Sequence, residues 1–478
     1  MAVDVTRRRF VAGSAAVGAG LALGGPMSAL ASNTRRGRRP PRVVGYGPLV
    51  PTPEEDSGEV FLELPRGFRY RVINREGQTM SDGNPTPGIF DGTGCYPGPR
   101  GTVILVRNHE NRSRDLEIPV VVPNGLRYDP DPNVRGGNTK LVVDRSSRRV
   151  IESFAVLAGT HTNCAGGVTP WNTWITCEEI FNYGSDEDAR TPDTPGVPHG
   201  YSFEIPADAD GPVDAVPIRP AGRFAHEAVA WLDGVLYETE DDNNAAFYRF
   251  LPRRRPREHG DLASFGGTLQ ALVVRGRPNL DMDEINPGES YPVEWVTIEE
   301  PNPLTNTVRL EAQSKGAAIF TRTEGIWASE RSVYFDCTSG GNANAGQIWK
   351  FTPRGRDGGE LELIFESPGA DVLDAPDNLV LVPQTGDVWL QEDGGGGDQF
   401  VRGVTQRGEI YDFAKTVINP TEFCGGCFSP DGRTFFVSQQ GNRVPQPAPN
   451  EDAALTYAIW GPFDLKSDRN RDGDRDRD

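Results

Sequence analysis

The feature that most constrains the fold is a pattern that recurs six times along the chain. It consists of an apolar strand, a turn with glycine or proline, and an aromatic-bearing strand that ends in acidic or amide residues; a polar loop and often a third strand follow. The copies begin at Gly101, Gly166, His226, Glu324, Asp377 and Gly425. Repeated small antiparallel sheets joined by irregular loops are typical of β-propellers. We therefore predict an all-β, six-bladed β-propeller with irregular loop insertions.

The stretch between the third and fourth copies, residues 251–316, indicates additional elements rather than a second domain. It contains "TLQALVV" and "PVEWVTI", which we expect to form outer strands, and "LEAQSKGAAIF", which we expect to contain a short helix. One or two such helices are compatible with the predicted propeller, which we expect to be a single domain over residues 42–463. Residues 464–478 are almost entirely charged and are predicted to be a disordered tail.

The first 31 residues have the features of an export signal. Arg7, Arg8 and Arg9 precede a glycine- and alanine-rich apolar run that ends in Ala29-Leu30-Ala31. This pattern is typical of twin-arginine signal peptides with a small-residue cleavage site. The run is shorter than the roughly 20 apolar residues that a spanning helix needs. We expect a monomeric protein in the periplasm, on the cell surface or outside the cell, without stable membrane insertion.

The charge balance favours cations as partners. The chain has 68 acidic and 49 basic residues and a formal net charge of −19, which argues against nucleic acid. In a propeller, corresponding strand ends meet at one end of the channel, and here many of them are acidic. The residues concerned are Glu110, Glu178, Glu179, Glu240, Asp241, Glu392 and Asp393. Crowded carboxylates repel one another unless cations lie between them.

The donor types narrow the choice of metal. Five histidines are scattered without the spacing of a zinc hydrolase. Carboxylate oxygens suit Ca²⁺, and a thiolate within such a shell hints at iron. Cys164 precedes a Gly-Gly pair and has two open interpretations, a metal ligand or a structural thiol, whereas Cys177 fits packing inside a blade. Cys424 and Cys427 could form a local disulfide or a metal clip.

Arg322 is the basic residue that stands out in this acidic setting. It alternates with Glu324 in "FTRTEG", so both side chains leave the same face of the expected strand. The arginine could be an ordinary surface ion-pair partner. It could also form paired hydrogen bonds with the phosphate or carboxylate of a substrate.

Several motifs together closely resemble the PhoX-type alkaline phosphatases. They include "NCAGGVTPWNTWITCEE", "GRFAHEAVA", "FTRTEG", "DAPDNL" and "WLQEDG", and the resemblance covers about residues 45 to 463. It implies an exported six-bladed propeller that hydrolyses phosphomonoesters. It also implies a cluster of iron(III) and calcium ions at the end of the channel.

The resemblance also implies roles for individual residues. Cys164 is similar to the iron-binding cysteine and Glu179 to a metal-bridging carboxylate. Arg322 resembles the arginine that holds the substrate phosphate, next to the catalytic Glu324. Further expected metal ligands are Glu324, Glu240, Glu110, Glu178, Glu392 and Asn378.

Two other function classes remain open at this point. A calcium-loaded propeller could bind a ligand or partner without catalysis, but it would not need Cys164 or Arg322. A propeller esterase or lactonase would need one calcium ion rather than a cluster.

Overall fold

The computed structural model describes residues 44–112, 118–181, 197–394, 397–442 and 452–464. These residues form an all-β unit with two short α-helices, α1 (Asp261–Phe265) and α2 (Val308–Ser314). Among the helices of this described part, none is long and apolar enough to cross a membrane. The expected signal peptide and all but the first residue of the expected tail lie outside the described residues.

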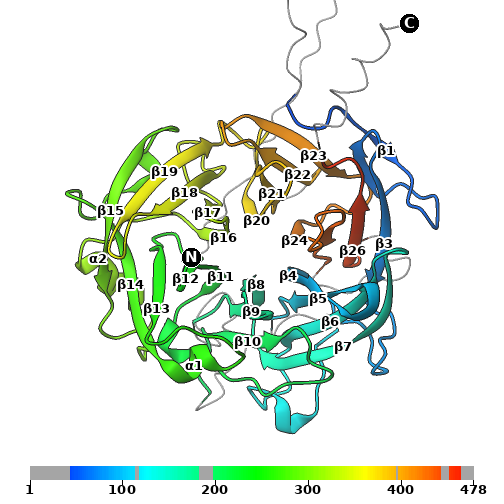
Figure 1. Cartoon of the computed structure of the whole chain (residues 1–478), viewed down its shortest axis with the longest axis horizontal. Helices are drawn as coiled ribbons and strands as arrows, with labels where there is room; N and C mark the ends of the chain where they lie inside the picture. The colour runs from blue at the N-terminus through cyan, green and yellow to red at the C-terminus, as the bar shows by residue number, and fades with distance from the viewer. Residues whose placement is uncertain (1–43, 113–117, 182–196, 395–396, 443–451, 465–478) are drawn as a thin grey trace, which may run out of the picture. The chain divides into compact units, whose positions relative to one another are not determined.

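The strands form five sheets, four of which have three to six strands and lie around a central axis (Figure 1). The first contains β4 (Phe90–Pro97), β5 (Thr102–His109), β6 (Gly136–Asp144) and β7 (Arg149–Thr160). The second contains β8 (Asn163–Val168), β9 (Thr173–Glu178) and β10 (Ser202–Pro206).

The other two of these sheets recruit strands from the start of the described chain. One contains β20 (Pro376–Leu381), β21 (Val388–Glu392), β22 (Phe400–Val404) and β23 (Ile410–Thr416), extended by β2 (Leu62–Pro65) and β1 (Leu49–Thr52). The other contains β24 (Phe423–Phe428), β25 (Phe435–Gln439) and β26 (Leu455–Trp460), and is completed by β3 (Arg69–Arg75).

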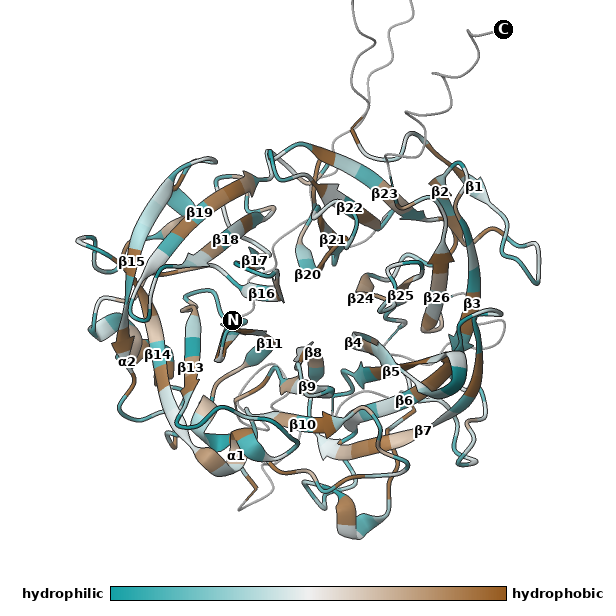
Figure 2. Ribbon diagram, in the orientation of Figure 1, coloured by the Kyte–Doolittle hydropathy of each residue, from teal (hydrophilic) through white to brown (hydrophobic). Residues whose placement is uncertain are grey.

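The fifth sheet has nine strands and contains two of the predicted repeats. Its first part is β11 (His226–Leu232), β12 (Val235–Glu240), β13 (Tyr248–Pro252), β14 (Gly267–Val274) and β15 (Ser290–Thr297). Its second part is β16 (Thr323–Ala328), β17 (Val333–Cys337), β18 (Gln347–Pro353) and β19 (Gly359–Glu366). Buried and half-buried residues alternate along β19, and Figure 2 shows both hydrophobic and hydrophilic residues on it.

The prediction of an all-β, propeller-like fold is confirmed, but the prediction of six separate blades is wrong. The structure has four separate blade-like sheets and the nine-stranded sheet. The reason is β15, which pairs with β14 along one edge and with β19 along the other. The outer strands expected within residues 251–316 correspond to β14 and β15, and the expected helix corresponds to α2. Because β15 forms hydrogen bonds with both β14 and β19, it joins two repeats into one sheet.

The innermost strands make a closed ring because glycines let their backbones approach. The ring runs β4, β8, β11, β16, β20, β24 and back to β4. A Cβ added to Gly167 of β8 would lie 2.0 Å from the Val229 carbonyl oxygen of β11, and one added to Gly325 of β16 would lie 2.5 Å from the Asp377 carbonyl oxygen of β20. No larger residue fits these positions without moving the strands.

The ring leaves little space along its axis. The cavity between the inner strands has a volume of about 20 Å³, and Gly92, Gly166, Gly325, Gly426 and Trp327 are among its lining residues. This volume accommodates roughly one water molecule. A phosphoester is too large for this cavity.

The glycine contacts predict a stability effect. Gly167→Ala forces a methyl group against the backbone of β11, so we expect it to lower the free energy of unfolding by roughly 3 kcal/mol, the upper end of overpacking costs. Gly211→Ala is the matched control, because a Cβ there meets nothing within 4 Å; it should change stability by less than about 0.5 kcal/mol. Thermal or denaturant unfolding measures both variants, and equal effects would contradict close packing of β8 on β11.

Candidate metal and phosphate site

Each innermost strand has an irregularity at or near its start that redirects a side chain. Register shifts occur within 90–93, 163–166, 226–229, 323–326, 376–378 and 424–427. The first five of these segments contain, in order, Asp91, Cys164, Glu227, Glu324 and Asp377. A β-bulge turns a side chain away from the regular alternation of the strand. The repeated bulge thus presents one acidic or thiol group from each of five strands at the same end of the ring.

These side chains come together in three groups that could hold metal ions. The groups are Cys164, Glu179 and Glu227; Glu227, Glu324 and Asp377; and Asp91, Glu110 and Glu422. Within each group, one donor atom per residue lies within 4.8 Å of the others. The first two groups share Glu227, so they form one continuous set of donors.

Glu227 is a buried carboxylate that lies close to other carboxylates of the donor set. It is 2% exposed, and among the described residues no hydrogen-bond donor reaches its Oε1 atom. Burial, followed by the charges of Asp377 and Glu179, raises the pKa of the Glu227 carboxyl well above its usual value. Burial likewise raises the pKa of Asp377 to about 6. A cation at this place would relieve both the desolvation and the repulsion.

Cys164 lies beside this carboxylate. Its Sγ atom is 3.4 Å from the backbone oxygens of both His226 and Glu227. Burial, and then the charges of Glu227 and Glu179, raise the pKa of the thiol. Without a cation the group is therefore a neutral thiol, and a bound metal would favour the thiolate. Cys177, by contrast, contacts the Ser202 hydroxyl within an apolar cluster, as a packing residue would.

Arg322 lies at the edge of the donor set, in a left-handed backbone conformation with φ 53°. Its Nε and Nη2 atoms bind the two oxygens of Asp241 at 2.8 and 3.1 Å. Nη2 also lies 2.5 Å from Oε1 of Glu324. Burial opposes the charge, but Glu324 and Asp241 offset this and raise the pKa of Arg322. The guanidinium is 30% exposed and can meet a ligand at the surface.

A second arginine lies at another edge of the donor set. Arg112 Nη2 is 2.8 Å from Oε1 of Glu110 and 3.7 Å from Oε2 of Glu179. It therefore links a residue of the Asp91 group with a residue of the Cys164 group.

Three of the expected ligands lie in other hydrogen-bond networks. Glu178 accepts hydrogen bonds from the backbone of His161, Gly200 and Tyr201 and contacts His199 Nδ1 at 2.7 Å. Glu392 binds the backbone of Asp374 and Phe400 and pairs with Arg402 at 2.5 Å. Glu240 accepts a hydrogen bond from the Tyr248 hydroxyl at 2.7 Å. Burial raises the pKa of both Glu240 and Glu392 to about 7.

The two-residue period of a strand explains this separation. Glu178, Glu240 and Glu392 occupy equivalent positions, each paired with the first residue of an inner strand. The next residue along the chain turns to the opposite side. Glu179, which follows Glu178, reaches a donor group, and Asp241, which follows Glu240, holds Arg322.

Asn378 has a positioning role next to the donor set. Its side chain accepts a hydrogen bond from the Gly425 backbone at 2.8 Å and donates one to Asp377 Oδ1 at 3.1 Å. It thus fixes the Asp377 carboxylate against β24.

The predicted ligands did not include Asp91, Glu227, Asp377 or Glu422. Most of the predicted ligands lie at the ends of second strands, whereas Asp91, Glu227 and Asp377 lie in bulges at the starts of inner strands. A usable signal was present, because most of the bulge residues precede a small residue, as in Asp91-Gly92 and Glu227-Ala228.

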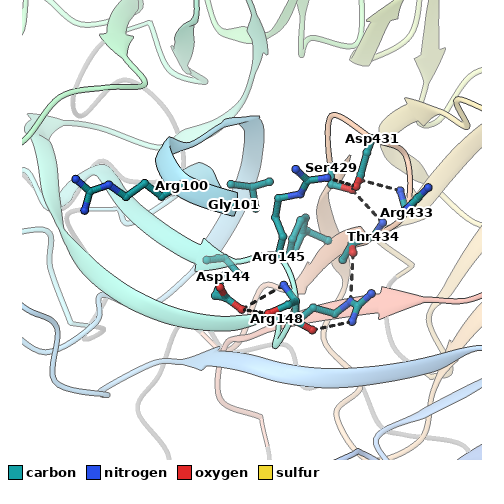
Figure 3. Close-up of a pocket in the computed structure, with 13 residues that line it drawn as sticks. Arg100, Gly101, Asp144, Arg145, Arg148, Ser429, Asp431, Arg433 and Thr434 are labelled. Carbon is teal, nitrogen blue, oxygen red and sulfur yellow. Dashed lines mark hydrogen bonds and ion pairs between the residues drawn. The ribbon is translucent and has the colours of Figure 1, made fainter.

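A cleft lined partly by basic residues lies elsewhere on the protein (Figure 3). It has a volume of about 480 Å³ and is lined by residues such as Arg145, Arg148, Asp431 and Arg433. Its basic groups are partly engaged: Arg145 pairs with Asp431 at 2.5 Å, and Arg148 packs over Trp460. The cleft lies at the Asp144 end of β6 and beyond the Phe428 end of β24, so it is remote from the donor set at the opposite strand ends.

The donor chemistry fits a group of cations. Carboxylate oxygens are the ligands that Ca²⁺ prefers, and a buried thiol suits a softer or redox-active metal. The fold and the site thus define a propeller-like protein with an acidic cation site at the axis and an arginine beside it.

The sequence model of the alkaline phosphatase PhoX family matches residues 44–442, so the chain belongs to this family. It is thereby a phosphoric monoester hydrolase that acts on small phosphomonoesters.

The chain is also similar to solved structures. Pseudomonas fluorescens PhoX in complex with vanadate, a transition state analogue, is 18% identical with a TM-score of 0.65 over 86% of this chain and 97% of that chain. A protein of unknown function from Dyadobacter fermentans is 9% identical (TM-score 0.45; 83% and 100% covered), and the Pseudomonas aeruginosa periplasmic gluconolactonase is 15% identical (TM-score 0.36; 82% and 88% covered). No match was found among curated proteins.

The environment of Glu227 predicts opposite effects with and without cations. In metal-free protein, Glu227→Gln removes a buried carboxylate with an unpartnered oxygen and should raise the melting temperature. In the presence of calcium, the same variant should weaken the apparent calcium affinity by roughly tenfold or more.

Glu178→Gln is the matched control, because Glu178 is equally buried but fully hydrogen-bonded. It should lower the melting temperature under both conditions and leave the calcium affinity unchanged. Calcium titrations followed by thermal unfolding separate the two outcomes; a Glu227→Gln variant with unaltered calcium response would contradict the assignment.

Proposed function

We propose that the chain is an exported phosphatase that hydrolyses phosphomonoesters at a calcium- and iron-containing cluster on the axis of the fold. The observation that carries the proposal is the set of buried carboxylates around Cys164 with Arg322 at its edge. Membership of the alkaline phosphatase PhoX family supports the reaction class. The metal identities and residue roles below are part of the proposal.

The proposed iron ligand is Cys164, with Glu179 and Glu227 beside it. The other proposed metal ligands are Asp91, Glu110, Glu324, Asp377 and Glu422. This assignment is supported by the short distances between donor atoms, which lie within 4.8 Å of one another in each group. We assign positioning roles to Glu178 and Glu392, because protein groups already occupy their oxygens. Glu240 stays a proposed metal ligand, because among the described residues its buried Oε1 atom has no hydrogen-bond partner. Asn378 holds Asp377 in place.

Arg322 is the proposed phosphate-binding residue. Asp241 holds two of its guanidinium nitrogens, which fixes the plane of the fork while the side chain stays partly exposed. A phosphoryl group at this edge would compete with Glu324 for Nη2 and gain a charge-assisted hydrogen bond. In the transition state the arginine would stabilise the charge on the equatorial oxygens.

Bound cations would neutralise the phosphoryl oxygens and lower the pKa of a water molecule. The chain's own residues supply the arrangement: the carboxylates and Cys164 gather at one end of the ring, and the partly exposed Arg322 lies at their edge. We expect the substrate to enter next to Arg322.

A calcium-loaded propeller that only binds a partner is the principal alternative. It would use the carboxylates, but a buried thiol inside the donor set and an arginine held rigidly at its edge would have no role. A propeller lactonase would need a single cation, whereas the donors here form three groups.

Turnover of p-nitrophenyl phosphate tests the role of Arg322. We expect Arg322→Ala to lower kcat/KM by roughly a hundredfold or more, with a raised KM, because the residue contacts the substrate phosphate. Arg433→Ala, which removes an arginine from the remote cleft, is the control and should leave both constants unchanged. Equal turnover by wild type and Arg322→Ala would contradict the assignment.

Substitution of Cys164 tests the proposed iron. Cys164→Ser replaces a thiolate with a neutral hydroxyl, so we expect loss of iron, loss of any visible thiolate-to-iron absorption band, and a fall in kcat of about a hundredfold or more. Cys177→Ser is the control, because Cys177 packs in the core and should affect stability only. A Cys164→Ser variant that keeps iron and activity would favour the binding alternative.

Export is tested at the twin arginines. Replacing Arg7 and Arg8 by lysine should retain the folded protein in the cytoplasm, since the twin-arginine pathway reads these residues. Cell fractionation with an antibody measures the distribution, and normal secretion of the variant would be incompatible with this route.

A further inference from the structure

The sheet β4–β7 meets the sheet that contains β24 where β24 packs on β4. A Cβ added to Gly425 of β24 would lie 2.4 Å from the Asp91 carbonyl oxygen and 2.7 Å from Thr93 Oγ1, both in β4. The two backbones are therefore in direct contact, and Figure 1 shows β4 and β24 side by side in the ring. Gly425 is two residues before Cys427, and Thr93 is two residues before Cys95, so the same step along both strands leads to a pair of cysteines.

Cys95 and Cys427 are neighbours across this contact. Cys427 is 1% exposed and belongs to an apolar cluster with Val103, Val143 and Phe436, and Cys95 packs against that cluster. Burial, and then Cys427, raise the pKa of the Cys95 thiol, as expected for side chains that lie near one another. Both are free in the structure.

We propose that Cys95 and Cys427 are the site of a disulfide that covalently joins the sheet β4–β7 to the sheet that contains β24. Two thiols lose two protons and two electrons, an S–S bond forms, and an oxidant of the disulfide or azo class takes up both hydrogens. With diamide, the N=N bond is reduced to the corresponding hydrazine. The inference is independent of the proposed phosphatase mechanism, since neither cysteine belongs to the donor set.

The alternative partner within the same strand is Cys424, and its surroundings argue against it. Its Sγ atom donates to the Phe90 carbonyl oxygen at 2.9 Å, at the end of β4 near the donor set. Cys424 and Cys427 therefore have different neighbours in this structure.

The basic cleft of Figure 3 borders the apolar cluster that contains Cys427. Val103, Val143 and Phe436 line that cleft and also pack around Cys427. Cys95 is only partly buried. Burial raises the pKa of the Cys95 thiol, so little thiolate is present and the bond should form slowly.

The disulfide would link β4 to β24, where the ring of inner strands closes. Noncovalent closure already comes from β3, which pairs with β26 although it precedes β4 in the chain. A disulfide between residues about 330 positions apart would restrict the unfolded chain strongly. We expect the oxidised protein to unfold at a temperature about 5 °C higher than the reduced protein.

The test is peptide mapping of the native full-length protein after treatment with diamide, with blocking of residual thiols before digestion. We expect one peptide pair linked through Cys95 and Cys427, a mass lower by two hydrogens, and a higher melting temperature that a reductant reverses. Cys95→Ser should abolish the bond and the temperature shift, whereas Cys337→Ser, a buried cysteine of another sheet, should preserve both.

A Cys424–Cys427 bond, or a protein in which both Cys95 and Cys427 remain alkylatable after oxidation, would overturn the proposal. Peptide mapping of the oxidised wild-type protein shows by itself which cysteines are linked. The test therefore stays decisive even if Cys95→Ser folds poorly.

Discussion

The central constraint on this structure is the unfavourable free energy of burying several carboxylates next to one another. Asp91, Glu227, Glu324 and Asp377 are each at most 8% exposed and approach the axis from four different strands. Burial and mutual repulsion raise the pKa of all four. Such an arrangement is unfavourable in itself and becomes favourable with cations among the oxygens. The acidic site and the fold that imposes it therefore have to be explained together.

Two features of the backbone impose the arrangement. Glycines such as Gly167 and Gly325 let neighbouring inner strands touch, which brings the starts of these strands close together around the axis. Bulges in the same strands then turn one side chain in each toward the common centre. The ion pairs of Arg322 with Asp241 and Glu324 complete the site by holding one positive group at its edge.

The class of fold and several residues of the candidate site could be predicted from the sequence. The repeat predicted small antiparallel sheets around an axis, and the motifs located Cys164, Glu179, Glu324 and Arg322, which the structure brings together. Six separate blades were expected, however, and pairing of β15 with β19 depends on contacts between distant segments that no local pattern reveals.

The remaining differences have a similar origin. A one-residue step decides whether a strand-end carboxylate faces the axis, so "CEE" places Glu179 in the donor set and Glu178 against His199. Residues at bulges, such as Glu227, break the alternation on which sequence interpretation depends. A sequence also gives no sign that Cys95 and Cys427 are neighbours, because they become so only when the ring closes.

The central claim is that the axial donor set holds cations that the hydrolysis of phosphomonoesters requires. The most direct measurement is the metal content of the purified protein together with phosphate release, before chelation, after chelation and after restoration of calcium. The account predicts bound calcium and iron in the active protein, loss of turnover when calcium is removed, and recovery when it is returned. A metal-free protein that hydrolyses phosphomonoesters at the full rate would contradict it.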